Sequence, residues 1–303
     1  MRFQPIAKNF GRYEILLLCS FPSRIMSTIA KPHAPEPLSW CQVGDIDPLA
    51  ESKSPNVKQD GREVDLLHYI YGRRDIKQLY GNPQKVLAAI DEYHTNHNML
   101  INVGPVKGAH ITKLIAEHKP SIMIELGGYI GYSAILFGDA VRANGGKKLY
   151  SLEKNPEMAA VANQLVDLAG LRDFVRIMVG SSDELLLELI RERKEIDHIE
   201  MLFLDHSTKH YLPDLWLLES MGVLLQDRTL LIADNVLMGG PMKYVDWVKA
   251  SPSQKHAMLG KWNTGGLKPN PNLIYETTVT KFDTDWGMVC LKLWSPRLMR
   301  NCH

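Results

Sequence analysis

The spacing of apolar and polar residues changes several times along the chain, and each change marks a predicted element. Short, continuous apolar runs bounded by turn residues are typical of parallel strands that are buried on both faces. The clearest such run lies at 121–126, between Pro120 and Gly127. Runs of the same kind occur at 148–153, 174–179, 201–205 and 229–234. We therefore predict a buried parallel sheet.

Helical periodicity separates these predicted strands. In residues 82–97, apolar side chains recur three or four positions apart behind Asn82-Pro83, which is a typical helix start. Helical character begins near residue 62, and further helices are predicted at 107–118, 132–142, 156–169, 182–192 and 212–219. The alternation of strands and helices predicts a doubly wound α/β sheet with helices on both faces.

The last two apolar segments differ from the earlier ones. Residues 273–280 and 287–293 alternate in polarity and have no helical stretch between them. Neighbouring segments of this kind pair antiparallel. The predicted sheet is therefore mostly parallel, with an antiparallel strand at one edge.

Composition indicates one large domain with an extension. The chain has 303 residues, of which 45% are hydrophobic, and this is enough to bury a sizeable core. We assign 61–303 to a single domain and 1–60 to an extension. The net charge of +1 does not indicate the basic surface that proteins use to bind nucleic acid. The four cysteines are too scattered for a disulfide framework or a metal site, which favours a reducing compartment.

The extension is basic, with Glu14 as the only acid through residue 35. Its apolar stretch at 15–21 is much shorter than the ~20 residues of a membrane helix, so we expect no integral membrane span. A disordered segment, a start upstream of the true one at Met26, a mitochondrial presequence and a weak signal peptide all remain open. We expect a cytoplasmic protein, or a mitochondrial one if the extension is a presequence.

A glycine-rich turn follows the first predicted strand. Gly127, Gly128 and Gly131 leave room for the backbone to reverse and to approach a ligand closely. The helix that begins near Gly131 offers free N–H groups to an anion. Dinucleotide-binding proteins use a similar turn, so the turn alone does not identify the ligand.

Two acids narrow the choice of cofactor. Glu153 ends the second predicted strand, where a carboxylate can accept hydrogen bonds from both ribose hydroxyls of a nucleoside. Glu125, at the mouth of the turn, would repel a pyrophosphate but can hold an ammonium group. S-adenosylmethionine therefore fits better than a dinucleotide. The alternative is an ordinary strand-to-helix turn with a surface glutamate.

Polar residues also end the fourth and fifth predicted strands. Asp205 follows one apolar run, and Asp234 and Asn235 follow the next. If these strands are neighbours, three oxygen ligands converge at the carboxyl edge of the sheet, where ligands bind in such folds. Oxygen ligands suit Mg²⁺. Alternatively, the two aspartates cap the helices that follow them.

Taken together, these motifs resemble the catechol O-methyltransferase family over residues 60–293. The matching stretches are Asn82-Pro-Gln-Lys-Val-Leu, Ile101-Asn-Val-Gly104, Glu125-Leu-Gly-Gly-Tyr-Ile-Gly-Tyr-Ser133, Glu153-Lys-Asn-Pro156, Phe203-Leu-Asp-His206, Tyr211-Leu-Pro-Asp214 and Ala233-Asp-Asn-Val236. The resemblance implies a Rossmann-like methyltransferase sheet and a monomeric enzyme. It also implies that S-adenosylmethionine and Mg²⁺ are used to methylate one hydroxyl of a small catechol, as in catecholamine metabolism.

The resemblance also assigns roles to individual residues. It implies that the methionine end of the cofactor lies against Val103 and Ser133, that Glu125 faces its amino group, and that Glu153 binds the ribose. Tyr129 would pack beside the cofactor, although a core aromatic role is equally open. The cofactor site of the family corresponds to Val103, Glu125, Gly127, Tyr129, Ser133, Glu153, Ser182, Asp183, Asp205 and His206. Of these, Ser182, Asp183 and His206 would line the adenine.

The catalytic residues are where this chain departs from the family. A gapless match places Ser207 and Thr208 where the family has an aromatic residue and a general-base lysine, and Lys209 comes one residue late. In a regular turn, one residue rotates a side chain by about 100°. Lys209 is our candidate base, and His210, solvent and a purely surface role for Lys209 remain alternatives.

The remaining matches concern the substrate. Glu276 best matches the acid that receives the second catechol hydroxyl, with Tyr275 as its competitor. Met99 and Gly239 replace a tryptophan and a proline of the family, which predicts a wider substrate mouth. A related enzyme with a non-catechol substrate and a non-catalytic binder of S-adenosylmethionine remain open.

Overall fold

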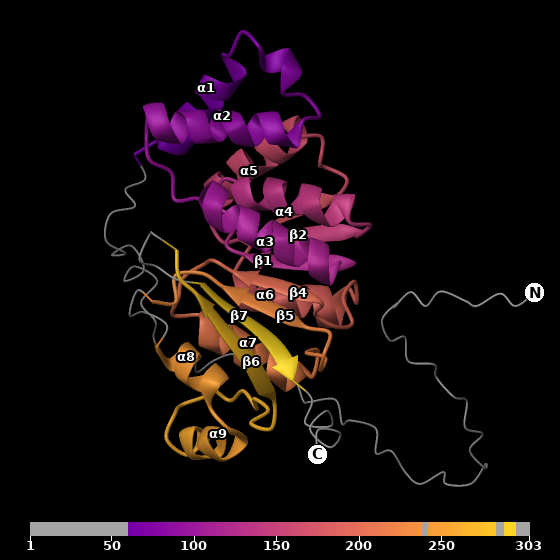
Figure 1. Cartoon of the computed structure of the whole chain (residues 1–303), viewed down its shortest axis with the longest axis vertical. Helices are drawn as coiled ribbons and strands as arrows, with labels where there is room; N and C mark the ends of the chain where they lie inside the picture. Colours follow the sequence, from indigo (N-terminus) through magenta and orange to yellow (C-terminus); the bar gives the residue numbers. More distant parts are fainter. Residues whose placement is uncertain (1–59, 238–241, 283–287, 295–303) are drawn as a thin grey trace, which may run out of the picture. The chain divides into compact units, whose positions relative to one another are not determined.

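The computed structural model describes residues 60–237 and 242–282, together with the backbone of 288–294. The chain divides into two units, Met1–Cys41 and Gln42–His303, and the described residues all belong to the second unit. Apart from Asp60, the predicted extension lies outside the described residues. In the predicted domain, the strands form one seven-stranded sheet in the order β3-β2-β1-β4-β5-β7-β6 (Figure 1). The strands are β1 (Ile122–Leu126), β2 (Lys148–Glu153), β3 (Val175–Val179), β4 (Met201–Leu204), β5 (Leu230–Ala233), β6 (Ile274–Thr280) and β7 (Met288–Trp294).

The pairing of the strands confirms the predicted topology. β3, β2, β1, β4 and β5 pair in parallel, and β7 pairs antiparallel with both β5 and β6. From β1 the chain first moves outward to β3 and then crosses back to β4 on the other side of β1. The strand order thus reverses between β1 and β4, which is the place where doubly wound sheets bind ligands beyond the carboxyl ends of their strands.

The helices agree with the predicted ones within a few residues. They are α1 (Arg62–Tyr71), α2 (Pro83–Asn96), α3 (Gly104–His118), α4 (Tyr132–Ala143), α5 (Pro156–Leu168), α6 (Ser182–Leu187), α7 (Tyr211–Met221), α8 (Met242–Lys249) and α9 (Pro252–Leu259), with short turns η2 (Ile76–Gln78) and η3 (Glu188–Glu192). The predicted helix at 182–192 is a six-residue α-helix that continues as the π-helical turn η3. We did not predict α8 and α9, which lie together near β6 in Figure 1.

Local sequence explains where α2 and α5 begin. Asn82 caps α2 by accepting a hydrogen bond from the Lys85 N–H at 3.0 Å, and Pro83 takes the first helical position. Asn155 caps α5 in the same way, from the Glu157 N–H at 2.8 Å. In each case the side chain satisfies an otherwise unpaired backbone donor, and the proline loses no hydrogen bond at that position.

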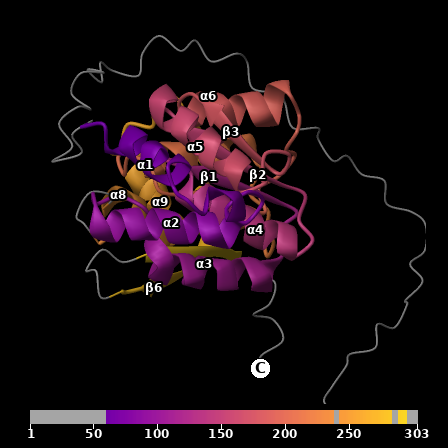
Figure 2. The ribbon, with the colours of Figure 1, turned by 90° about the horizontal axis from the view of Figure 1, so that it is seen from above.

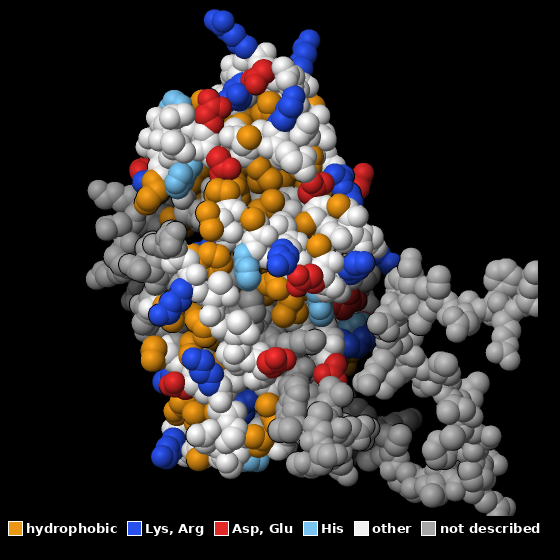
Figure 3. Space-filling view, viewed as in Figure 1, with side chains coloured by type: hydrophobic (Ala, Val, Ile, Leu, Met, Phe, Trp, Pro, Cys, Tyr) orange, Lys and Arg blue, Asp and Glu red, His pale blue; other side chains and the backbone are white. Residues whose placement is uncertain are grey.

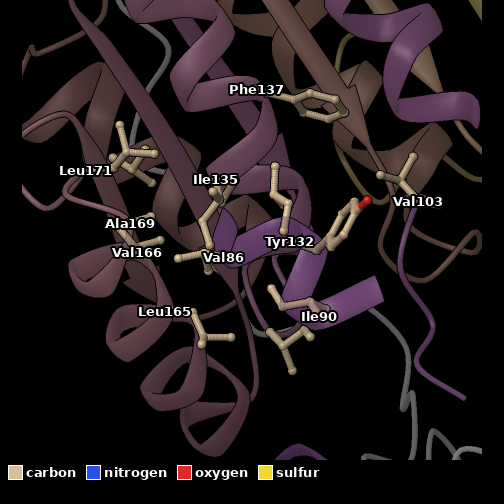
Figure 4. Packing of buried hydrophobic residues seen from close by; sticks show 14 of the residues in the cluster. Val86, Ile90, Val103, Tyr132, Ile135, Phe137, Leu165, Val166, Ala169 and Leu171 are labelled. Carbon is tan, nitrogen blue, oxygen red and sulfur yellow. The ribbon is translucent and has the colours of Figure 1, made fainter. Parts of the chain in front are cut away.

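The sheet separates two apolar clusters. One cluster lies between the sheet and α1 to α5, and it contains alternate strand residues such as Met123, Phe203 and Ile232. Figure 4 shows side chains that the helices contribute to this cluster, such as Val86, Ile135 and Leu165. The other lies on the opposite face, against α6 to α8, and contains Ile124 and Leu202. Figure 2 shows α3 and α6 on opposite sides of the strands. Because successive residues in a strand face opposite ways, each residue's place in this alternation assigns it to one cluster.

Basic and acidic side chains are interspersed on the face drawn in Figure 3, with no large area of one sign. Within the part of the chain that the structure describes, no helix combines the length and the apolar character needed to cross a membrane.

Candidate functional site

Three carboxyl groups meet on the face of the sheet that α3 and α4 cover. Glu125 continues the alternation of Met123 in β1. The strand register places Leu204 opposite Ala233, so Asp205 and Asp234 leave β4 and β5 at the same level. Both aspartates continue the alternation of Phe203 and Ile232, and they therefore face the same side as Glu125. The structure thus brings together the acids that the sequence placed at the strand ends.

Glu125 is completely buried. Its Oε2 accepts a hydrogen bond of 2.5 Å from the hydroxyl of Ser151, which is its register partner in β2. Burial raises the pKa of Glu125 to about 7, although the hydroxyls of Ser133 and Ser151 oppose this shift. The predicted contact of Glu125 with an ammonium group is chemically reasonable, because a cation would favour the ionised form of this buried acid.

Asp205 and Asp234 influence each other. Burial, followed by the charge of Asp234, raises the pKa of Asp205 well above its ordinary value of 3.8. Burial also raises the pKa of Asp234, against the opposing effect of a hydrogen-bonded lysine. Two neighbouring carboxylates that repel one another in a poorly hydrated place favour a shared cation.

That lysine is Lys107, which the sequence analysis did not select. Its Nζ donates to both oxygens of Asp234, at 2.6 and 2.7 Å. Lys107 is 8% exposed and Asp234 is 3% exposed. The two residues are 127 positions apart, so the sequence contained no local sign of the pair. A lysine in the first turn of a helix, two residues after Pro105, was the available clue.

Asn235 lies beside Asp234 in a left-handed conformation, with φ of 58°. Its backbone N–H donates to Asp234 Oδ1 at 2.8 Å. One polar atom of its side-chain amide is 2.8 and 3.2 Å from the two oxygens of Asp234. If that atom is the nitrogen, it donates to the carboxylate. If it is the oxygen, it joins Asp205 and Asp234 as a third oxygen ligand.

These three side chains could hold a divalent cation. No group of three His, Cys, Asp or Glu side chains suited to a metal occurs among the described residues. The present set consists of two carboxylates and one amide, and its oxygen atoms match the preference of Mg²⁺. The charge of Asp234, which raises the pKa of Asp205, is a second indication that the donor set fits a cation.

The glycine turn contacts the aspartate loop directly. Gly127 has φ of 93°, and a Cβ atom there would lie 2.5 Å from the backbone oxygen of Asp205. The Asp205 N–H also donates to the oxygen of Leu126 at 2.9 Å. The proposed cofactor turn and the carboxyl cluster are therefore parts of one continuous site, and a side chain at position 127 would separate them.

Glu153 supports this turn from β2. Its Oε2 accepts hydrogen bonds from the N–H groups of Gly128 and Tyr129, at 3.1 and 2.8 Å. Its Oε1 accepts another from the Asn155 N–H at 2.7 Å. A carboxylate has about four acceptor positions, and these three contacts leave about one for a hydroxyl donor. Glu153 is consequently placed beside the glycine turn, where a ribose would lie.

Tyr129 is held in a strained position. Its φ is 43°, which is uncommon for a bulky residue. Its hydroxyl donates to Glu63 Oε1 at 2.5 Å, and Glu63 is buried in α1. The ring also packs against the apolar cluster of α1 to α5. Glu63 was missed, although an acid one turn before Leu66 on the apolar side of α1 was a signal that the sequence contained.

Two of the three residues predicted for the adenine, Ser182 and His206, meet at Asp214. Its Oδ2 accepts a hydrogen bond from the Ser182 hydroxyl at 2.7 Å and lies 2.7 Å from His206 Nε2. Asp214 is buried in the first turn of α7. Asp183 is half-buried in the first turn of α6, beside Ser182. Asp214 formed part of a matching motif, but we did not assign it a role.

Two cofactor residues lie at the starts of helices. Val103 directly precedes α3, and its side chain belongs to the apolar cluster (Figure 4), so any cofactor contact would come from its backbone. Ser133 is the second residue of α4 and is buried.

Lys209 lies in a turn between β4 and α7. The His210 N–H donates to the oxygen of Ser207 at 2.9 Å and closes this turn. Thr208 is half-buried, whereas Lys209 is exposed. No hydrogen bond or ion pair of Lys209 occurs within the described part of the chain. Lys209 follows Asp205 by four residues, but the structure shows no hydrogen bond or ion pair between these two described side chains.

Glu276 lies level with the start of β5, whereas the carboxyl cluster lies beyond its end. It pairs with Lys292, and Lys292 pairs with Leu230 at the start of β5. Asp234 follows the opposite end of β5. Four strand residues correspond to about 13 Å, so the structure does not bring Glu276 next to Asp234. Its competitor Tyr275 is buried on the other face and donates to Glu219 Oε1 at 2.5 Å.

Met99 and Gly239 are the two positions predicted to widen the substrate mouth. Met99 is 65% exposed. Gly239 lies outside the described residues.

Comparisons with known proteins agree with this geometry. A methyltransferase domain family matches residues 124–236. Catechol O-methyltransferase of Mus musculus is 41% identical over 173 residues, which are 57% of this chain and 64% of that protein. The protein of the same name from Sus scrofa is 39% identical over 149 residues, which are 49% of this chain and 78% of that protein.

The matches differ in how much of each known protein they cover. The matched stretch spans less than two thirds of the mouse protein and of the next two relatives, at 61–65% of their lengths. Among solved structures, an O-methyltransferase from Bacillus cereus in complex with SAH has a TM-score of 0.51 at 15% identity, covering 75% of this chain and 99% of that one. This second likeness shows the same fold.

The identity to the pig protein extends over more than three quarters of that relative. The methyltransferase domain match at residues 124–236 includes the glycine turn and both aspartates. The chain belongs to the catechol O-methyltransferase family.

Proposed function

We propose that this chain transfers a methyl group from S-adenosylmethionine to one hydroxyl of a catechol-type substrate, with Mg²⁺ as the metal. One observation carries the proposal. Asp205 and Asp234 end neighbouring parallel strands at the same level, and the backbone of Asp205 contacts the glycine turn that follows β1. A cofactor in the turn and a substrate at the aspartates would therefore be immediate neighbours, as methyl transfer requires.

The chain's own residues would position the cofactor from three sides. Glu153 accepts hydrogen bonds at the ribose position, and buried Glu125 faces the amino group. His206 and Ser182, joined through Asp214, border the adenine. The cofactor supplies an electrophilic methyl group on a sulfonium. The substrate oxygen forms the new C–O bond as the S–C bond breaks, and S-adenosylhomocysteine leaves.

Asp205, Asp234 and Asn235 would hold the metal, which supplies Lewis acidity toward the hydroxyls of the substrate. The proton of the reacting hydroxyl goes to a base, and we assign this role to Lys209. In support, Lys209 follows Asp205 by four residues, and its long, exposed side chain can turn back toward the carboxyl cluster. His210 and solvent are the competing acceptors.

The position of Glu276 favours a second candidate function, namely methylation of a substrate with a single hydroxyl group. The family's acid for the second catechol hydroxyl matches Glu276, which lies about 13 Å along the sheet from the level of Asp234. A substrate that needs no acceptor for a second hydroxyl would be unaffected by this distance.

A methyl-transfer assay distinguishes these candidates. We expect transfer from S-adenosylmethionine to simple catechols, and much less transfer to the corresponding monophenols. Equal transfer to both classes would favour the second candidate. Calorimetric binding of S-adenosylmethionine with no transfer to either class would contradict both and would indicate a non-catalytic binder.

A further inference from the structure

Lys107 occupies an unfavourable place for a lysine. It lies in the first turn of α3, which contains no acidic residue. The N-terminus of a helix carries a partial positive charge and disfavours cations. Lys107 is also buried, and burial of an ammonium group is costly unless it is paired. A lysine that is disfavoured by both effects needs a specific partner.

That partner is the carboxyl cluster. The Lys107 Nζ contacts both oxygens of Asp234, at 2.6 and 2.7 Å. Its field also reaches Asp205. Asp205 and Asp234 together carry two negative charges when both are ionised, and the ammonium group of Lys107 balances one of them. Lys107 and a divalent cation together would bring three positive charges to these two carboxylates.

The residue after Lys107 lies at a close contact between α3 and α4. A Cβ atom on the next residue, Gly108, would lie 2.5 Å from Leu136 in α4. The missing side chain thus allows α3 and α4 to approach closely at this turn. The helix that carries Lys107 is thus packed closely against α4.

We propose that Lys107 is an internal counter-cation that lowers the affinity of the Asp205–Asp234–Asn235 site for divalent metal and stabilises Asp234 when no divalent metal is bound. This inference rests on the proposed function, since it takes these three residues as the metal site. Lys107 repels a metal ion that shares Asp234 with it. The metal is consequently bound more weakly than the oxygen ligands alone would allow.

The test replaces Lys107 with methionine, which keeps a long side chain and removes the charge. We expect the affinity for Mg²⁺, measured by calorimetry on the full chain saturated with S-adenosylmethionine, to rise by roughly 10- to 100-fold, because a nearby positive charge is removed. We expect the melting temperature in the presence of chelator to fall, and added Mg²⁺ to recover most of this loss. Lys113→Met, at an exposed position of the same helix, should change neither quantity.

Two further variants keep the test decisive. Lys107→Arg retains the charge and should bind Mg²⁺ about as the wild type does. Lys107→Gln can still donate a hydrogen bond to Asp234 without a charge, so it should bind more tightly even if Lys107→Met does not fold. If the wild type binds Mg²⁺ and the folded neutral variants bind it equally or more weakly, the counter-cation role is wrong and the proposed function stands. If neither the wild type nor any variant binds Mg²⁺, the metal assignment of the proposed function fails and this inference fails with it.

Discussion

At the scale of single residues, buried Glu125 gives the fold a specific pH dependence. Burial raises its pKa from 4.5 to about 7 in the folded protein. The unfolded chain therefore releases this proton at lower pH than the folded chain does, and stability falls as the pH rises from about 4.5 to 7. A shift of this size corresponds to at most about 3 kcal/mol. We expect Glu125→Gln to remove this loss when unfolding by urea is compared at pH 5 and pH 8.

The control is Glu192→Gln, which changes an exposed acid and should leave the pH dependence of the wild type intact. Stability curves of equal slope for the wild type and Glu125→Gln would contradict the assignment of this pKa shift to Glu125.

The proposed base can be tested by its contribution to the rate. If Lys209 accepts the hydroxyl proton, Lys209→Met should lower kcat by about 10² to 10⁴ at neutral pH, the usual contribution of a positioned general base. Thr208→Ala should have little effect. A mild effect of Lys209→Met, with activity that climbs with pH, would instead assign the proton to solvent. A double variant with Thr208→Lys and Lys209→Met that is faster than Lys209→Met would show that position 208 faces the substrate.

Residues differ in how well the sequence predicts them. Asp205 and Asp234 were predictable because an apolar run ends at each, and the alternation of a strand fixes the face on which each lies. Lys107 and Glu63 were not assigned, because each acquires its partner only when α3 or α1 packs against the rest of the domain. Glu276 was matched by motif alone, and the antiparallel register of β6, β7 and β5 sets its height on the sheet.

At the scale of elements, the turn after β1 and the loop after β4 share one tight contact at Gly127. A Cβ atom there would approach the Asp205 backbone to 2.5 Å. We expect Gly127→Ala to lower stability by about 1 to 3 kcal/mol and to abolish cofactor binding, because both the left-handed backbone and the contact are disturbed. Thermal unfolding and calorimetry measure the two effects.

Gly145→Ala is a matched control, since Gly145 has a similar φ of 85° and nothing lies within 4 Å of its added Cβ. It should lose some stability to backbone strain and retain cofactor binding. Cofactor binding by Gly127→Ala that equals the wild type's would show that this contact is not needed by the site.

Asp214 connects α6, the end of β4 and α7 through its hydrogen bonds with Ser182 and His206. We expect Asp214→Asn to weaken S-adenosylmethionine binding by about 1 to 3 kcal/mol, the contribution of hydrogen bonds to a charged group. Ser182→Ala should add little further loss in the Asp214→Asn background, because the two residues act through one contact. Additive losses in this double-mutant cycle, measured by calorimetry, would contradict a shared role.

Most helices and strands before residue 240 were predicted from their apolar pattern, whereas the two short helices that follow were not. The strand at 148–153 matches β2 at both ends, and Asn82-Pro83 correctly marked the start of α2. The helices α8 and α9 were missed, since each has only eight residues. Part of their attachment depends on distant residues. Lys255 in α9, for example, donates to the oxygen of Leu273 at 2.6 Å.

At the scale of the whole described domain, the order of the strands creates the site. Because the chain crosses from one side of β1 to the other, the carboxyl ends of β1, β2, β4 and β5 lie along one edge. The alternation of strands and helices was enough to predict this class of fold. The order of the strands cannot be read from alternation alone, so the sequence left open whether the strands that end at Asp205 and Asp234 are neighbours, and the sheet shows that they are.

We propose that the glycine turn and the two aspartates form one metal-dependent methyl-transfer site. The most direct measurement is methyl transfer from S-adenosylmethionine to a simple catechol, by wild type and Asp234→Asn, in chelator and after Mg²⁺ is restored. We predict that the wild type is inactive in chelator and recovers with Mg²⁺, whereas Asp234→Asn stays folded and inactive in both conditions. Undiminished activity of the wild type in excess chelator, or full activity of Asp234→Asn, would contradict the account.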